Sequence, residues 1–200
     1  MSLRAAGRWA VGAATALCLF GCSSAVARSE EAPELSLSGP WADQFQAAYA
    51  RAESAYEKDV LRDGVVTPVE YEQSRNRLRS CLSDSGYTIE WDAKGGFSLG
   101  AADESYPDDF FERSDPVLQR CEATWSGSIL YLFEQVRRNP AKQDEAALQV
   151  ACLQSVGLVD ATYTKQRWTH DNERDDFPFD ATSKEAARCS VDPLGLWYAE

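Results

Sequence analysis

The stretch DGVVTPVEY resembles the second half of a calcium-binding EF-hand loop. On a twelve-residue loop, Asp59, Asp63 and Glu70 would take the first, fifth and twelfth positions, with Gly64 at the sixth. The third position, which needs an oxygen ligand, is Leu61, and the next residue adds a positive charge. We therefore expect a calcium site on Asp59, Asp63 and Glu70 to be absent, or to bind no more tightly than millimolar.

A second interpretation of the same residues requires no metal. Gly64 ends one helix in a left-handed conformation, Thr67 caps the next, and Pro68 occupies its first turn. Glu70 completes a Thr-x-x-Glu capping box. We favour this interpretation, in which the stretch connects two helices as an αα-hairpin.

Two other acidic runs contain residues that could do chemistry. Residues 170–176, HDNERDD, combine His170 with four carboxylates that could attract a divalent cation. Within residues 104–116, an acid and base pair could come from Asp108, Asp109, Glu112 and Asp115. Such runs are more often solvated faces or carboxylates at a helix N-terminus, so we predict no catalytic residues and no cofactor beyond the weak calcium candidate.

Aromatic side chains could line a groove for a glycan or a peptide, although packing in the core is their commoner use. The candidates are Trp91, Phe97, Tyr106, Phe110, Phe111, Trp168 and Trp197.

The first residues have the features of an export signal. Residues 1–21 carry Arg4 and Arg8 ahead of an apolar run that is too short to anchor stably in a bilayer. The run ends in LFGC, a pattern similar to the lipobox of bacterial lipoproteins, which predicts lipidation of Cys22 and a membrane attachment through its acyl chains. An ordinary cleavage site at Ala25–Ala27 leaves plain secretion as the alternative.

The rest of the chain divides into a tether and one domain. Residues 22–40 contain few apolar side chains and predict a flexible tether, and residues 41–200 predict a single extracytoplasmic domain. The formal net charge of −12 excludes nucleic acid as a partner, because phosphates repel an acidic surface.

Hydrophobic periodicity predicts a mainly α fold of the α+β kind, with one small β-hairpin. The expected helices cover residues 41–60, 68–85, 116–139 and 141–157, followed by short helices near 163–173 and 183–189. Asp115 is the expected N-cap of the third helix, and the alternation YTIEW…GFSL predicts the hairpin over residues 87–99.

Four cysteines remain once Cys18 and Cys22 are set aside, which favours two disulfides in an oxidising compartment. CLSDSGY and CLQSVGL share the pattern Cys-Leu-x-x-x-Gly, and a proline precedes each motif, so we infer two duplicated helix-hairpin units over residues 41–121 and 116–189. Of the three possible connectivities, a bridge inside each unit is favoured: Cys81 with Cys121, and Cys152 with Cys189.

DGVVTPVEY followed by SCLSDSGY, behind an export signal and a lipobox, resembles the uncharacterised secreted lipoproteins of high-GC Gram-positive bacteria. The resemblance covers about Ala47 to Tyr87 well and the later cysteines loosely. It implies a compact, mainly helical extracytoplasmic domain, and it carries over no catalytic residue.

The expected function is that of a non-catalytic cell-envelope lipoprotein that binds a cell-wall component, a peptide or a protein. Two alternatives remain open at this stage: a calcium-dependent binding protein that uses the degenerate loop, and an enzyme of unrecognised type.

Lipidation of Cys22 predicts a chain that begins at this residue and carries a diacylglyceryl group. Intact-mass analysis of membrane-extracted protein should show that adduct, and Cys22→Ser should leave the chain unprocessed or release it to the medium. A mature N-terminus at Arg28 would contradict the prediction.

Overall fold

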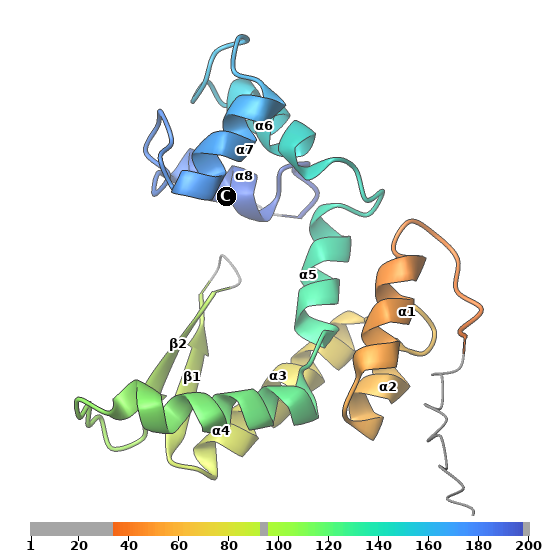
Figure 1. The fold of residues 1–200 in the computed structure, drawn as a ribbon, viewed down its shortest axis with the longest axis vertical. Helices are drawn as coiled ribbons and strands as arrows, with labels where there is room; N and C mark the ends of the chain where they lie inside the picture. The colour runs from red at the N-terminus through yellow and green to blue at the C-terminus, as the bar shows by residue number, and fades with distance from the viewer. Residues whose placement is uncertain (1–33, 93–95, 198–200) are drawn as a thin grey trace, which may run out of the picture. The chain divides into compact units, whose positions relative to one another are not determined.

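The computed structural model describes residues 34–92 and 96–197 of the chain. Within these ranges it contains eight helices and one two-stranded antiparallel hairpin (Figure 1). The elements are α1 (Ala42–Arg51), α2 (Ala55–Leu61), α3 (Pro68–Ser83), β1 (Tyr87–Trp91), β2 (Phe97–Ala101), α4 (Phe110–Trp125), α5 (Ile129–Arg138), α6 (Glu145–Ser155), α7 (Lys165–Arg174) and α8 (Lys184–Val191).

The mainly helical fold with a small hairpin is confirmed. None of the helices in the described ranges has both the length and the apolar character needed to cross a bilayer. The expected signal peptide and Cys22 lie outside the described residues.

The prediction of one helix over residues 41–60 is wrong, because the chain breaks between α1 and α2. Ala52 has an extended backbone, and the Ser54 hydroxyl caps α2 by accepting a hydrogen bond from the Glu57 backbone at 3.0 Å. The break turns the Glu57 side chain into the interior, where it is 4% exposed. A capping serine therefore overrides a continuous apolar stripe.

The prediction that Asp115 caps the third helix is also wrong. Helix α4 begins at Phe110, and both Asp115 and Pro116 lie inside it. Phe110 is 5% exposed and its ring lies 5.9 Å from that of Tyr87. Burying an aromatic side chain contributes about 2–3 kcal/mol, which helps to offset the hydrogen bond that the proline removes.

The expected single helix up to residue 139 is interrupted at residues 126–128, between α4 and α5. Gly127 has a left-handed φ of 42°, and a Cβ atom there would overlap the Glu57 carboxylate. Glu57 instead accepts a hydrogen bond from the Ser128 backbone at 2.6 Å. The break thus depends on a residue about seventy positions away, which no local pattern could reveal.

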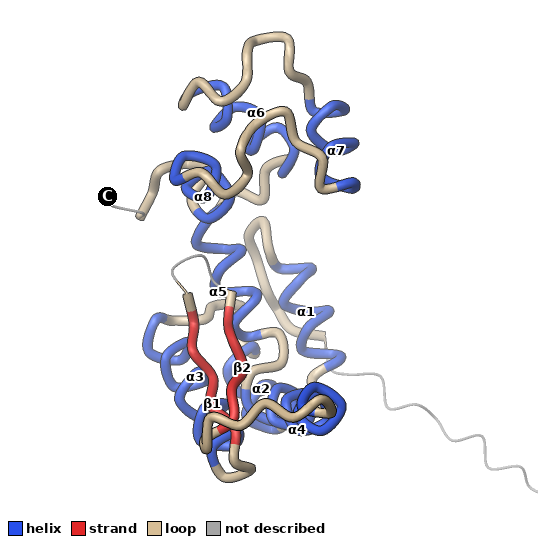
Figure 2. Tube along the Cα trace, turned by 90° about the vertical axis from the view of Figure 1, so that its left-hand side faces the viewer, coloured by secondary structure: helices blue, strands red, loops and turns tan. Residues whose placement is uncertain are grey.

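The hairpin forms as predicted, with Tyr87 paired to Ala101 and Trp91 paired to Phe97. Ile89 is 4% exposed and packs with Leu78 and Leu82 of α3, so the hairpin lies against that helix (Figure 2).

Both predicted disulfides are present. Cys81 of α3 is bonded to Cys121 of α4, and Cys152 of α6 to Cys189 of α8. The bridges span 40 and 37 residues, so each contributes about 4 kcal/mol in the chain-entropy description.

The two bridged segments share part of one plan. In each, the helix with the first cysteine is followed by a glycine of positive φ, Gly86 at 84° and Gly157 at 76°. The segments between the bridged helices differ, because the first contains the hairpin and the second contains α7. The repeat is therefore clearest at the first cysteine of each unit and its bridge.

The end of the expected tether belongs to the folded domain. The Leu35 backbone donates to the Gln46 side chain at 2.7 Å, and Leu37 packs against the core of α1, α2 and α5. Folded structure therefore begins ahead of residue 41, because two half-buried leucines supply contacts that the polar composition of the segment conceals.

Burial raises the pKa of the Glu57 carboxyl above its ordinary value of 4.5, and the hydrogen bond from Ser128 only partly lowers it. A raised carboxyl pKa favours the protonated form in the folded state. The contribution of Glu57 to the free energy of unfolding is therefore largest below pH 4.5. It is lost as the pH rises through the raised pKa of this carboxyl in the folded state.

Glu57→Gln should remove this pH dependence, because the amide oxygen keeps the acceptor for Ser128 and does not ionise. Urea unfolding at pH 4 and pH 8 should show that the free energy of unfolding of the variant, relative to wild type, increases with pH. Glu90→Gln, an exposed strand position, controls for loss of the charge alone. If the free energies of unfolding of Glu57→Gln and wild type differ by the same amount at pH 4 and pH 8, the prediction is wrong.

Candidate functional site

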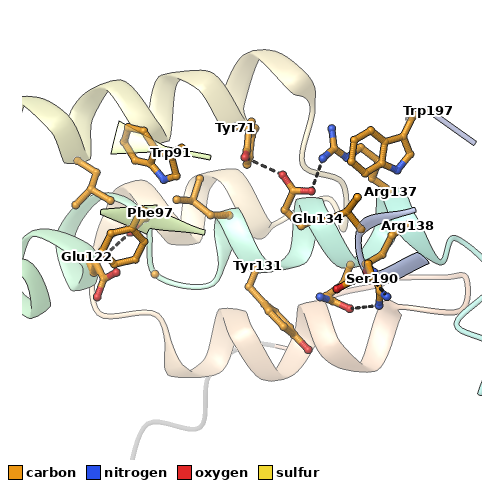
Figure 3. A pocket seen from close by; sticks show the side chains of 16 residues that line it. Tyr71, Trp91, Phe97, Glu122, Tyr131, Glu134, Arg137, Arg138, Ser190 and Trp197 are labelled. Carbon is orange, nitrogen blue, oxygen red and sulfur yellow. Dashed lines mark hydrogen bonds and ion pairs between the residues drawn. The ribbon is translucent and has the colours of Figure 1, made fainter. Parts of the chain in front are cut away.

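The best candidate for a site is a groove of about 560 Å³, a volume within the usual range of ligand cavities. It is bounded by α3, the hairpin, the end of α4, α5 and the chain around and after α8 (Figure 3). Its lining residues are Tyr71, Leu78, Trp91, Phe97, Glu122, Ser126, Gly127, Leu130, Tyr131, Glu134, Gln135, Arg137, Arg138, Ser190, Val191 and Trp197.

Aromatic side chains form much of the wall. Trp91 and Phe97 are partners across the hairpin, so the strand register presents both to the groove. Phe97 is 46% exposed, and Tyr131 of α5 is 57% exposed. Large exposed aromatic faces beside a cavity are surfaces that a ligand can cover favourably.

Two arginines of α3 already stack on Trp91. The guanidinium of Arg75 lies 4.3 Å from the ring centroid, and that of Arg79 lies 5.0 Å from it. These cation–π contacts orient the indole. They also occupy the Trp91 ring with cations of the chain itself.

A chain of polar contacts crosses the groove along α5. The Tyr71 hydroxyl donates to the Glu134 carboxylate at 2.7 Å, and Glu134 also pairs with Arg137. Burial, together with the bond to Glu134, raises the pKa of Tyr71 to about 12. Tyr71 therefore stays protonated at neutral pH and holds the carboxylate in place.

The part of the groove wall that Trp197 forms, near the C-terminus, is positioned by the buried carboxylate of Asp192. Asp192, 1% exposed, accepts hydrogen bonds from the backbones of Leu196 and Trp197 at 2.8 and 2.9 Å. The guanidinium of Arg137 lies 3.4 Å from the Trp197 ring centroid. The position of Trp197 is thus set from both its backbone and its ring.

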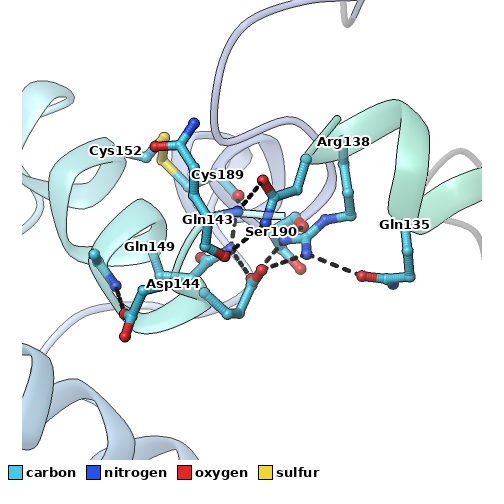
Figure 4. A network of polar contacts seen from close by, with 11 residues as sticks. Gln135, Arg138, Gln143, Asp144, Gln149, Cys152, Cys189 and Ser190 are labelled. Atoms are coloured by element: carbon cyan, nitrogen blue, oxygen red, sulfur yellow. Dashed lines mark hydrogen bonds and ion pairs between the residues drawn. A yellow bond between two sulfur atoms is a disulfide. The ribbon is translucent and has the colours of Figure 1, made fainter. Parts of the chain in front are cut away.

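Arg138 connects α5 to the C-terminal helices (Figure 4). Its guanidinium forms a bidentate ion pair with Glu145 at the start of α6, in which both N–O distances are 2.8 Å. It also donates to the carbonyl of Ser190 in α8 at 2.8 Å. Bidentate pairs of this kind are directional as well as strong, so they fix the two walls of the groove against each other.

Glu122 differs from the other charged residues of the groove. It lies near the end of α4, and its carboxylate has no hydrogen bond or ion pair with the residues that the structure describes. Burial alone raises the pKa of this carboxyl. Glu122 is therefore available to a ligand.

The predicted aromatic groove is partly assembled. Trp91, Phe97 and Trp197 line the cavity. Tyr106, Phe110 and Phe111 instead form a separate cluster, and Trp168 packs in the core of the C-terminal helices. Sequence reasoning therefore identified some of the wall but not its partners on α3 and α5.

The groove residues on α5 that were not predicted do form a recognisable pattern in the sequence. Tyr131, Glu134 and Arg138 follow helical spacing on α5, on the side opposite the buried Ile129 and Leu132. An aromatic and charged stripe beside an apolar one suggests a functional face, but the sequence does not show what it faces.

The candidate calcium ligands take part in local contacts. Asp59 pairs with Arg62, and Asp63 accepts a hydrogen bond from the Val65 backbone at 3.1 Å. In the described ranges no three His, Cys, Asp or Glu side chains are grouped to hold a metal ion.

The predicted capping box is confirmed. The Thr67 hydroxyl accepts from the Glu70 backbone at 3.2 Å, and the Glu70 carboxylate accepts from the Thr67 backbone at 2.8 Å.

The remaining acidic candidates do not converge on the groove. His170, the only histidine of the chain, contacts Arg174 on the exposed side of α7. Asp171 is buried beneath Tyr163 and Arg167, which both donate to it at 2.9 Å. Asp109 precedes α4 and Glu112 lies in its first turn, in the position that the helix dipole favours.

Thr67→Ala should destabilise the fold by about 1 kcal/mol, because it removes one half of the capping box. Thr67→Ser, which keeps the hydroxyl, should remain close to wild type. Thermal unfolding with and without calcium measures both effects, and we expect no calcium dependence. Micromolar calcium binding that Glu70→Gln abolishes would contradict this assignment.

Comparisons of the chain with protein-family models, with curated proteins and with solved structures found no match.

Proposed function

We propose that this protein is a non-catalytic binding module of the cell envelope, and that its ligand occupies the groove between the hairpin and α5. The observation that carries the proposal is the exposed aromatic wall of Phe97 and Tyr131 beside a cavity of about 560 Å³. Binding sites combine apolar walls with a few polar groups held in place, and this groove has both.

The polar groups support binding because they are held before any ligand arrives. Tyr71 holds Glu134, and Glu145 holds Arg138. A ligand that meets preorganised groups loses less free energy to their ordering than one that must order them.

The proposal includes an extracytoplasmic location, with attachment to the outer face of the membrane through lipid on Cys22, or secretion if the chain is cleaved further on. The export signal and the lipobox-like pattern support it. Two disulfides are also typical of oxidising compartments.

Binding in the groove should depend on its exposed aromatic side chains. An isotope-labelled chain can be titrated with an N-acetylglucosamine trimer and with blocked tripeptides while amide resonances are followed by NMR. At least one probe should shift the resonances of Phe97 and Tyr131. Phe97→Ala and Tyr131→Ala should each weaken that binding about tenfold or more, because each removes an aromatic contact.

Phe111→Ala is the matched control, since Phe111 is 67% exposed and lies outside the groove. The proposal is wrong if no probe shifts the groove resonances, or if all three variants bind like wild type.

A further inference from the structure

The ligand class follows from which charges in the groove are already paired. Four charged side chains line it: Glu122, Glu134, Arg137 and Arg138. Glu134 accepts from Tyr71 and pairs with Arg137, while Arg138 pairs with Glu145. Among the described residues, the carboxylate of Glu122 is therefore the one lining charge without a counter-ion.

The position of Glu122 makes its negative charge unfavourable in the absence of a ligand. It lies in the last turn of α4, which ends at Trp125, and the carbonyl end of a helix dipole repels an anion. Partial burial adds a desolvation cost, which is why the pKa of this carboxyl is raised. A cation placed against Glu122 would relieve both effects.

The aromatic wall favours the same kind of ligand. A cation bound over an aromatic face is stabilised by the ring quadrupole. Arg75 and Arg79 already stack on Trp91, so the free aromatic face is that of Phe97, its partner across the hairpin, which is 46% exposed. Glu122, Trp91 and Phe97 are drawn at the same end of the groove in Figure 3.

We propose that the groove binds a basic peptide segment, with a cationic side chain paired to Glu122 and its aliphatic stem against Phe97. This assignment rests on the proposed function and specifies its ligand. A cavity of about 560 Å³ has room for flanking peptide residues as well as the cationic side chain. The net charge of −12 attracts basic segments and disfavours acidic ones.

The test compares three blocked tripeptides: Ala-Lys-Ala, the same sequence with Nε-acetyllysine, and Ala-Glu-Ala. Acetylation removes the charge and leaves the stem. The lysine peptide should bind at least about tenfold more tightly than the acetyllysine peptide, because a hydrogen-bonded charge pair is lost in the latter. Ala-Glu-Ala should bind most weakly.

Glu122→Gln should reduce the affinity for the lysine peptide to that for the acetyllysine peptide. Glu90→Gln removes the same charge from an exposed position on β1, outside the groove, and should leave the preference intact. Circular dichroism of both variants confirms that they are folded.

The outcomes separate the two proposals. Equal binding of the lysine and acetyllysine peptides, with Phe97→Ala weakening both, would overturn the cationic assignment and leave the groove as the binding site. A lysine preference that survives Glu122→Gln would also overturn it. No shift of groove resonances by any peptide or by the glycan trimer would overturn both.

Discussion

The groove depends on the guanidinium of Arg138, whose side chain is only 12% exposed. It pairs with Glu145 at the start of α6 and donates to the Ser190 carbonyl in α8. Since Cys152 and Cys189 tie α6 to α8, one arginine on α5 fixes a bridged group of helices. Without Arg138, the wall that contains Ser190 would lose a direct hydrogen bond to α5, the helix that carries Tyr131.

Buried acids perform a second structural task, which is to shape the backbone around the groove. Glu57 lies against Gly127 and accepts from Ser128, and it thereby sets the turn from which α5 begins. Asp192 holds the backbone of Trp197 through two hydrogen bonds. Each acid carries a desolvation cost that its hydrogen bonds partly offset, so these positions tolerate loss of an acceptor poorly.

The groove contains both polar side chains that already have partners and side chains that do not. Tyr71 and Arg137 both bind Glu134, and Glu145 and the Ser190 carbonyl bind Arg138, so these side chains shape the groove more than they offer free polar groups. Exposed aromatic area and the carboxylate of Glu122 remain without a partner among the described residues. This division between fixed scaffold and open surface is common in binding sites, where preorganised groups lower the entropic cost of association.

The sequence by itself determined the capping box at Thr67 and Glu70, the β-hairpin, and the pairing of Cys81 with Cys121 and of Cys152 with Cys189. Caps, turns and strand alternation act over a few residues, and the bridges followed from a visible repeat. Only the tertiary structure decided the break after Trp125 and the partly buried position of Glu122 in the groove. These depend on contacts such as Glu57 with Ser128, which join residues far apart in the chain, and a local pattern contains no information about them.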